Sequence, residues 1–217
     1  MTGQAHTRNE QHYIPAMGKH WLLALYDPFT RLAGVGPIHE QLLDRADLRP
    51  GQRVLEIGCG TGNLLTALGR RRLDLEALGI DPDPAALRRA GRKAARRKLP
   101  IRYEQANACA LPLPDAGFDR VLSALMLHHL DDAEKLGALR EVRRVLRPGG
   151  QLHVVDVDGT PSGQAAGRRK IHRHPLVAGS RPERVTAALT EAGLTGVVEN
   201  GRSSTRFGNV VFYRADR

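Results

Sequence analysis

The sequence predicts an α/β fold: a seven-stranded, mostly parallel sheet with helices on both faces and an antiparallel C-terminal strand. Short apolar runs alternate with helical patterns from residue 54 to residue 157. A glycine-rich turn follows the first run, at residues 58–62. Two further strand-like runs, at 197–201 and 209–214, close the chain as a hairpin.

The composition fits one globular domain with a short segment before it. The chain has 217 residues, 41% of them apolar, which is enough for a real core. We assign residues 1–47 to an N-terminal helical cap and residues 48–217 to the main domain. No apolar run reaches the length of a membrane span, and residues 1–13 lack the apolar centre of a signal peptide. A cytoplasmic protein is expected.

The charge balance is strongly basic. Net charge is +10, from 33 Lys and Arg against 23 Asp and Glu. Such a surface attracts anions, including nucleic acid. The basic residues are spread widely, so nucleic acid stays an alternative partner rather than the first choice. The two cysteines, Cys59 and Cys109, have no metal-binding spacing, and we expect structural thiols and no metal.

The N-terminal segment gathers aromatic residues that are scarce elsewhere. Residues 20–32 form an apolar segment that contains Trp21, Tyr26 and Phe29, in a chain with 4% aromatic residues. Either this segment is a helix that packs on the core, or it closes over a ligand and lines the pocket of an acceptor molecule. After a Gly-Pro break, residues 38–46 give one more helix.

The turn after the first strand is the most specific pattern in the chain. Residues 54–63 read Val-Leu-Glu-Ile-Gly-Cys-Gly-Thr-Gly-Asn, a buried strand followed by three alternating glycines and a helix start, which Thr61 is expected to cap. Glycines let the chain turn and let its backbone approach a ligand closely. Glu56 precedes the loop and would repel a pyrophosphate, but not a cationic or hydroxyl-rich ligand.

Asp81 ends the second strand, at residues 75–80. A carboxylate at this point can accept hydrogen bonds from both vicinal hydroxyls of a ribose. Alternatively, Asp81 caps the next helix, at residues 87–98. Asp83 is the better cap, because Pro84 would then occupy the first helical position.

Histidines follow the fourth strand. The third strand covers residues 100–105 and the fourth 118–124, and a Leu-Met-Leu-His-His-Leu segment comes next. His128 or His129 can orient an acceptor or take a proton there. Alternatively, one histidine packs or caps while the other faces water.

The next helix starts at Asp131 or Asp132 and stops before a Pro-Gly-Gly turn. The fifth strand, at residues 151–157, carries Asp156 close to the expected acceptor pocket. Residues 160–174 are glycine-rich and basic, and form either a loop over the acceptor or a solvated loop.

These motifs resemble those of a known family. The glycine turn resembles motif I of the class I S-adenosylmethionine-dependent methyltransferases, (V/L)-L-(D/E)-(I/V)-G-x-G-x-G. The Phe-Asp-x-Val run at 118–121, the Leu-His-His-Leu segment and the Leu-x-Pro-Gly-Gly ending at 146–150 continue the resemblance, which is close to the ubiquinone/menaquinone-biosynthesis type. It implies a Rossmann-like fold and S-adenosylmethionine as cofactor. The cofactor-binding residues that it implies are Glu56, Gly58, Cys59, Gly60, Gly62, Asn63, Asp81, Pro82, Asn107, Ala108 and Leu125.

The resemblance also implies individual roles. Asp81 would hold the ribose hydroxyls, and Leu125 would lie by the methionine end of the cofactor. Asn107 stands where the family usually has an Asp that accepts from the adenine amino group. An amide oxygen can still accept there, without the charge.

Methyl transfer to a small-molecule acceptor under an N-terminal lid is therefore the predicted function. Trp21, Tyr26, Phe29 and Asp156 would line the pocket, and proximity would supply most of the catalysis. One alternative is a nucleic-acid methyltransferase, which the charge favours. Against it, no Asn-Pro-Pro-Tyr-type tetrapeptide follows the fourth strand. The other alternative is a catalytically silent cofactor-binding protein.

Overall fold

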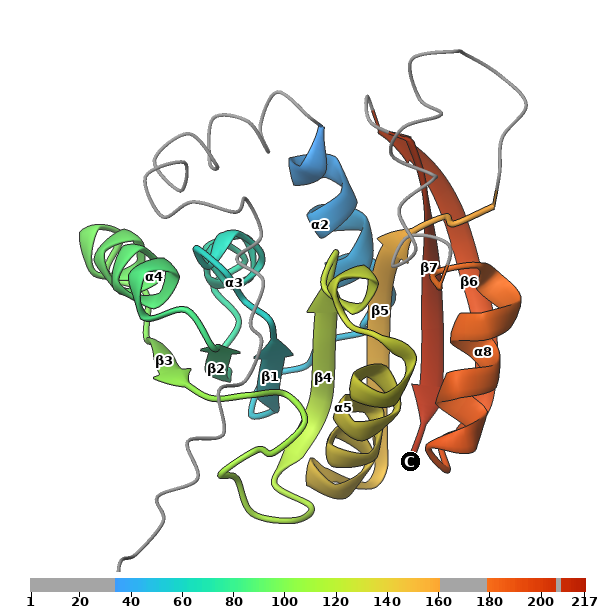
Figure 1. Cartoon of the computed structure of the whole chain (residues 1–217). Helices are drawn as coiled ribbons and strands as arrows, with labels where there is room; N and C mark the ends of the chain where they lie inside the picture. Colours follow the sequence, from blue (N-terminus) through green and yellow to red (C-terminus); the bar gives the residue numbers. More distant parts are fainter. Residues whose placement is uncertain (1–33, 161–178, 206–207) are drawn as a thin grey trace, which may run out of the picture.

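The computed structural model describes residues 34–160, 179–205 and 208–217. Seven strands form one sheet in the order β3-β2-β1-β4-β5-β7-β6 (Figure 1). The strands are β1 (Arg53–Ile57), β2 (Glu76–Asp81), β3 (Ile101–Gln105), β4 (Phe118–Ala124), β5 (Leu146–Val157), β6 (Thr195–Thr205) and β7 (Gly208–Asp216). Strands β1 to β5 are parallel, and β7 runs antiparallel to both of its neighbours. The predicted sheet and its reversed last strand are confirmed.

Helices cover both faces of the sheet. They are α2 (Val35–Arg45), α3 (Asn63–Arg70), α4 (Pro84–Arg96), α5 (Asp132–Val145) and α8 (Pro182–Glu191). Side chains alternate between the two faces along each strand. Val54 of β1 therefore packs in one cluster with apolar residues of α2 and α3, while Leu55 packs in the other with those of α5 and α8. The sheet therefore has one hydrophobic core on each of its two faces.

Two helix starts settle alternatives that the sequence left open. Asp83 Oδ1 accepts from the Ala85 N–H at 2.7 Å with Pro84 next to it, so Asp83 is the cap of α4. Asp131 caps α5, and its carboxylate accepts from the Glu134 N–H at 2.8 Å. The Glu134 side chain bonds back to the Asp131 N–H, which completes a capping box.

Three expectations need correction. Thr61 does not cap α3, because the cap position is Gly62, whose left-handed backbone (φ 73°) starts the helix one residue later. Strand β5 begins at Leu146, before the Pro-Gly-Gly turn, because Leu146 already pairs with Phe118 of β4. Helix α2 begins at Val35, since a proline in its first turn is tolerated there.

Some predictions fall outside the described residues. Trp21, Tyr26 and Phe29 are among them, and so is nearly all of the basic stretch at 160–174. In the part of the chain that is described, no helix combines the length and the apolar character needed to cross a membrane.

Candidate functional site

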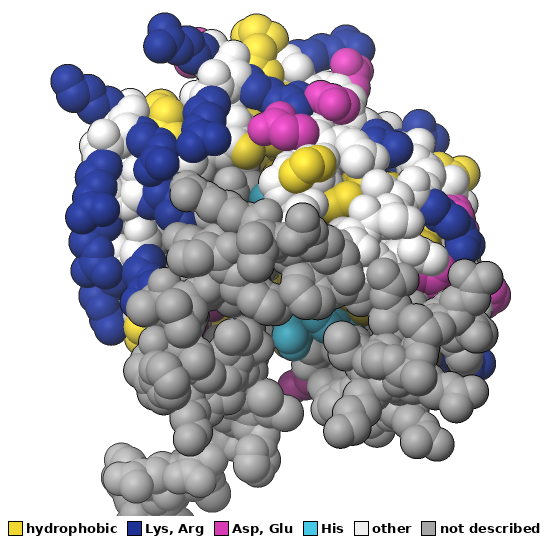
Figure 2. Space-filling view, turned by 90° about the horizontal axis from the view of Figure 1, so that it is seen from above, with side chains coloured by type: hydrophobic (Ala, Val, Ile, Leu, Met, Phe, Trp, Pro, Cys, Tyr) yellow, Lys and Arg dark blue, Asp and Glu magenta, His cyan; other side chains and the backbone are white. Residues whose placement is uncertain are grey.

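The candidate site lies at the edge of the sheet where the parallel strands end. A doubly wound sheet binds ligands at this edge, where the strand order reverses, and here the reversal falls between β1 and β4. Figure 2 looks onto this edge from above. Histidine side chains lie near the centre of the view, and Lys and Arg side chains gather on the side where α4 lies.

The turn between β1 and α3 depends on glycine geometry. Gly58, Gly60 and Gly62 have φ angles of 66°, 51° and 73°, in a region that other residues enter at a cost of about 1–2 kcal/mol. A Cβ at Gly58 would collide with Met126, and a Cβ at Gly62 would lie 2.5 Å from the Tyr103 hydroxyl. A Cβ at Gly60 would meet no atom of the described residues within 4 Å. Within that part of the chain, the backbone at Gly60 is open to close approach by a ligand.

Asp81 connects the glycine loop to the end of β2. Its Oδ2 accepts from the Gly60 N–H at 2.8 Å, and its Oδ1 accepts from the Asp83 N–H at 2.9 Å. Burial raises the pKa of Asp81, and these two N–H groups oppose the shift. Among the described residues, no further donor takes the other lone pairs of Asp81 beside Gly60.

Glu56 lies beneath the loop and anchors it. The side chain is buried and accepts from the Leu65 backbone N–H in the first turns of α3. Its Oε2 has no hydrogen-bond partner among the described residues. Burial, and the nearby Asp81, raise the pKa of Glu56 well above its usual value.

A lysine on α4 fixes the start of α3. The Lys93 ammonium donates to Asn63 Oδ1 at 2.5 Å. Asn63 is the first residue of α3, so this bond links the two helices at the glycine loop. Asn63, which is predicted to bind the cofactor, thus also makes a hydrogen bond that joins α3 to α4.

Asn107 and Ala108 lie in the turn after β3, next to the end of β2. The Ala106 N–H donates to the Asp81 backbone carbonyl at 3.3 Å, which ties this turn to β2. Asn107 Oδ1 accepts from the Cys109 N–H at 2.9 Å and so closes a local turn.

Leu125 holds a strained backbone at the end of β4. Its φ is 56°, and its N–H donates to the Val155 carbonyl at 2.8 Å. A leucine persists in this conformation only where the surrounding structure imposes it, and such positions cluster at functional sites. The next residue, Met126, lies on Gly58, and the short helix η2 (Leu127–His129) follows.

The structure brings His128 against Asp156, although 28 residues separate them. Nδ1 of His128 lies 2.6 Å from Asp156 Oδ1, and the His128 backbone N–H donates to Oδ2 at 2.9 Å. Asp156 is fully buried, whereas the His128 side chain is 17% exposed. His129 is exposed, and the centroid of its ring lies 4.0 Å from the centroid of the His128 ring.

The sequence analysis placed both residues near the acceptor but did not pair them. The signal for the pair was present, because His128 follows β4 and Asp156 ends β5. Neighbouring parallel strands end at the same edge, and β4 pairs with β5 up to Ala124 and Val155. The contact of Met126 with Gly58 was not predicted either, because a methionine after a strand does not by itself indicate packing on the glycine loop.

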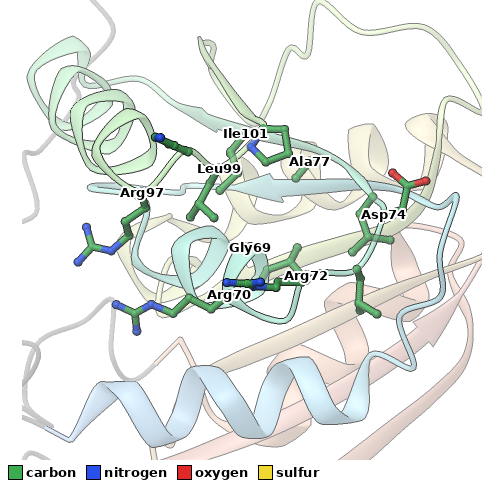
Figure 3. A pocket seen from close by; sticks show the side chains of 13 residues that line it. Gly69, Arg70, Arg72, Asp74, Ala77, Arg97, Leu99 and Ile101 are labelled. Atoms are coloured by element: carbon green, nitrogen blue, oxygen red, sulfur yellow. The ribbon is translucent and has the colours of Figure 1, made fainter.

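A second hollow lies at the opposite edge of the sheet (Figure 3). It is a cavity of about 810 Å³ between the ends of α3 and α4 and the starts of β2 and β3. Its apolar floor includes Leu99 and Ile101, and its rim carries basic residues. Arg70 and Arg97 extend to the same side of it in Figure 3, away from Asp74. This cavity is remote from Asp81 and the glycine loop.

The chain is similar to known methyltransferases. A family model described as a methyltransferase domain matches residues 54–150. The chain is 38% identical to the demethylmenaquinone methyltransferase of Thermus thermophilus over 141 residues, which cover 64% of this chain and 63% of that protein. It is 34% identical to the 27-O-demethylrifamycin SV methyltransferase of Amycolatopsis mediterranei over 170 residues, or 76% and 58% of the two chains. The chain thus spans less than two thirds of the length of these relatives.

Solved structures share the fold. A SAM dependent methyltransferase from Aquifex aeolicus aligns with a TM-score of 0.69 and 21% identity, over 91% of this chain and 97% of that one. The phosphoethanolamine N-methyltransferase 2 of Haemonchus contortus, solved with S-adenosyl-L-methionine, aligns with a TM-score of 0.74 and 15% identity, over 93% and 58%. At these identities the likeness shows the fold alone.

Proposed function

Because this chain belongs to the class I S-adenosylmethionine-dependent methyltransferases, we propose that it transfers a methyl group from that donor to a small-molecule acceptor. S-adenosylmethionine is the methyl donor of the family, and it supplies a methyl group on a positively charged sulfur that is already activated for attack. The observation that carries the proposal is the open face of Gly60 beside the lone pairs of Asp81. The vicinal hydroxyls of a ribose suit the acceptor chemistry of Asp81 there.

The residues that we assign to the donor surround this point. Asp81 accepts from the ribose hydroxyls, and Asn107 with Ala108 frames the adenine. Leu125 lies at the methionine end, close to the glycine loop through Met126. The remaining donor residues in this proposal are Glu56, Gly58, Cys59, Gly60, Gly62, Asn63 and Pro82.

We assign the acceptor to the region around His128 and Asp156. Two relatives are named for methylating a menaquinone precursor and a rifamycin, which are small molecules with ring systems. An apolar acceptor that carries a ring is therefore the proposed class. Residues 1–47 would form a cap over it, with Trp21, Tyr26 and Phe29 toward the ring; these three residues lie outside the described part of the chain.

The position of the basic cavity supports a small acceptor over a nucleic acid. Its basic rim, with Arg70, Arg72, Arg97 and Lys98, lies at the amino ends of β2 and β3. A polyanion held there would contact the edge of the sheet that faces away from Gly60. This part of the positive charge therefore does not favour an anionic polymer as methyl acceptor.

Calorimetric titration of the full chain with S-adenosylmethionine tests the proposal, with NAD as the control ligand. We expect saturable binding of S-adenosylmethionine alone. Methyl transfer is then measured on ring-bearing small molecules and, separately, on RNA. Preference for NAD, or transfer to RNA alone, would contradict the proposal. Tight binding with no transfer to any acceptor would instead support the silent cofactor-binding alternative.

A further inference from the structure

Asp156, at the end of β5, binds both the backbone and the ring of His128. Its Oδ2 accepts from the His128 N–H at 2.9 Å, and its Oδ1 lies 2.6 Å from Nδ1. The Val157 N–H also donates to Oδ1, at 2.7 Å. Burial disfavours the charge on Asp156, but His128, the Val157 N–H and the nearby His129 together lower the pKa of Asp156 below its usual value. Two backbone N–H groups and the His128 ring all face the two carboxyl oxygens, as expected for an ionised carboxylate.

This contact fixes which ring nitrogen of His128 carries the proton. An ionised carboxylate can only accept hydrogen bonds, so Nδ1 holds the proton whenever the ring is neutral. The lone pair is then on Nε2, on the other side of the ring. Among the described residues, Nε2 makes no hydrogen bond, and the side chain is partly exposed at the edge where β4 ends. Within the described part of the chain, His128 thus keeps an acceptor nitrogen that no protein group occupies.

Charged and polar groups from other elements surround the pair. Lys135 of α5 is buried, donates to the Gly179 carbonyl at 3.1 Å, and interacts with the charge of Asp156. Tyr213 of β7 has a buried hydroxyl with no described partner, and the charge of Asp156 contributes to its raised pKa. The Lys135 cation and the neutral Tyr213 phenol are both compatible with an ionised Asp156.

We propose that His128 takes a proton from the acceptor through Nε2, with Asp156 as its positioning residue, and that the acceptor presents a phenolic or enolic hydroxyl. The inference rests on the proposed methyl transfer. A neutral amine has a lone pair and can attack while it keeps its protons. A neutral hydroxyl would become an oxonium ion, so loss of its proton has to accompany the attack.

The step balances without a further reactant. The hydroxyl proton moves to Nε2 of His128, and the electron pair left on oxygen forms the new bond to the methyl carbon. The bond from that carbon to sulfur breaks, and its electron pair stays on sulfur as a neutral thioether. Asp156 stabilises the positive ring until His128 returns its proton to water.

Nuclear magnetic resonance tests the geometry without an acceptor. Long-range proton–nitrogen correlation spectra of the ¹⁵N-histidine-labelled full chain show which nitrogen of each neutral ring is protonated, and His128→Gln identifies the signals. We expect protonated Nδ1 in the wild type and a shift toward protonated Nε2 in Asp156→Asn. Protonated Nε2 in the wild type, or no change in Asp156→Asn, would overturn the inference.

Kinetics test the chemistry, with 1-naphthol as the hydroxyl probe and 1-naphthylamine as its amine counterpart. We expect transfer to 1-naphthol and a kcat lower by about 10²-fold or more in His128→Gln and Asp156→Asn. The donor Kd should stay within about threefold of wild type, since neither residue touches the glycine loop. Transfer to 1-naphthylamine alone would overturn the acceptor class.

Two comparison variants separate chemistry from folding. Asp119 is another buried carboxylate, held by the Arg53 N–H at 2.7 Å and by Arg147 at 2.6 Å, and it lies near the opposite edge of the sheet. Asp119→Asn should lose stability but keep kcat. His129→Gln should lose far less kcat than His128→Gln, and an equal loss would overturn the assignment to His128. If S-adenosylmethionine fails to bind at all, the proposed function fails; if it binds and only these contrasts vanish, the function stands and the inference falls.

Discussion

Replacing Asp81 by asparagine separates its two tasks, which are to hold the glycine loop and to accept from the ribose. Asparagine has one oxygen, so either the Gly60 or the Asp83 N–H loses its acceptor. An unpaired buried donor costs about 1–3 kcal/mol, and a hydrogen bond to a charged group contributes about 1.5–3 kcal/mol. Since 1.4 kcal/mol is about tenfold in affinity, we expect a Kd for S-adenosylmethionine about 10- to 100-fold higher.

The assay is calorimetric titration, with thermal unfolding in parallel. In a chain of this size each kcal/mol lowers Tm by about 2–4 °C, so the variant should melt several degrees lower. Asp83→Asn is the matched control, because asparagine caps a helix as well as aspartate does and the Asp83 side chain takes no part in the proposed site. The reasoning is refuted if Asp81→Asn binds the donor as tightly as wild type, or if Asp83→Asn weakens binding equally.

Three further predictions concern other parts of the chain. Gly60→Ala should bind the donor poorly while losing only about 1–2 kcal/mol of stability. Gly62→Ala should lose more stability, because its Cβ would clash with the buried hydroxyl of Tyr103. Urea unfolding and calorimetry measure both effects, and the reverse order would contradict the site. Burial, together with nearby arginines, lowers the pKa of His153 from 6.5 to about 4, so between these values the unfolded chain binds a proton that the folded chain excludes. The free energy of unfolding should therefore fall as pH drops through this window, by at most about 3 kcal/mol, and His153→Leu should show a smaller fall between pH values of about 7 and 5 in urea titrations. The double variant Arg70→Gln, Arg97→Gln should keep donor affinity and turnover but reduce salt-sensitive RNA binding, since both residues line the remote cavity; lost turnover would place that cavity in the reaction.

Most of the sheet could be predicted from local chemistry. The runs of β-branched and apolar residues define the parallel strands, and Gly58 to Gly62 mark the turn that the backbone angles require. Asp83 was identified as the better cap because Pro84 follows it, and the structure confirms this. These features depend on residues within a few positions of each other.

The start of β5 and the His128–Asp156 pair depend on contacts between distant residues, whereas the cap of α3 depends on the backbone of a neighbouring glycine. The start of β5 at Leu146 is set by pairing with Phe118, which no local pattern around the Pro-Gly-Gly turn reveals. Thr61 is a good capping residue, but the backbone of Gly62 takes the cap position. The pairing of His128 with Asp156 likewise depends on strand order, which had to be assumed before two separate segments could be placed together.

The backbone of Leu125 also bears on how far this protein can be made heat-resistant. Glycine adopts a left-handed backbone without a steric penalty, and Leu125 has such a backbone. Exchanging Leu125 for glycine would relieve about 1–2 kcal/mol of strain. It would also make the backbone between β4 and η2 more flexible, and this backbone positions His128 beside Asp156. Leu125→Gly would therefore raise Tm but let the His128 ring adopt more orientations. At Leu125, higher thermal stability and a fixed catalytic geometry oppose each other.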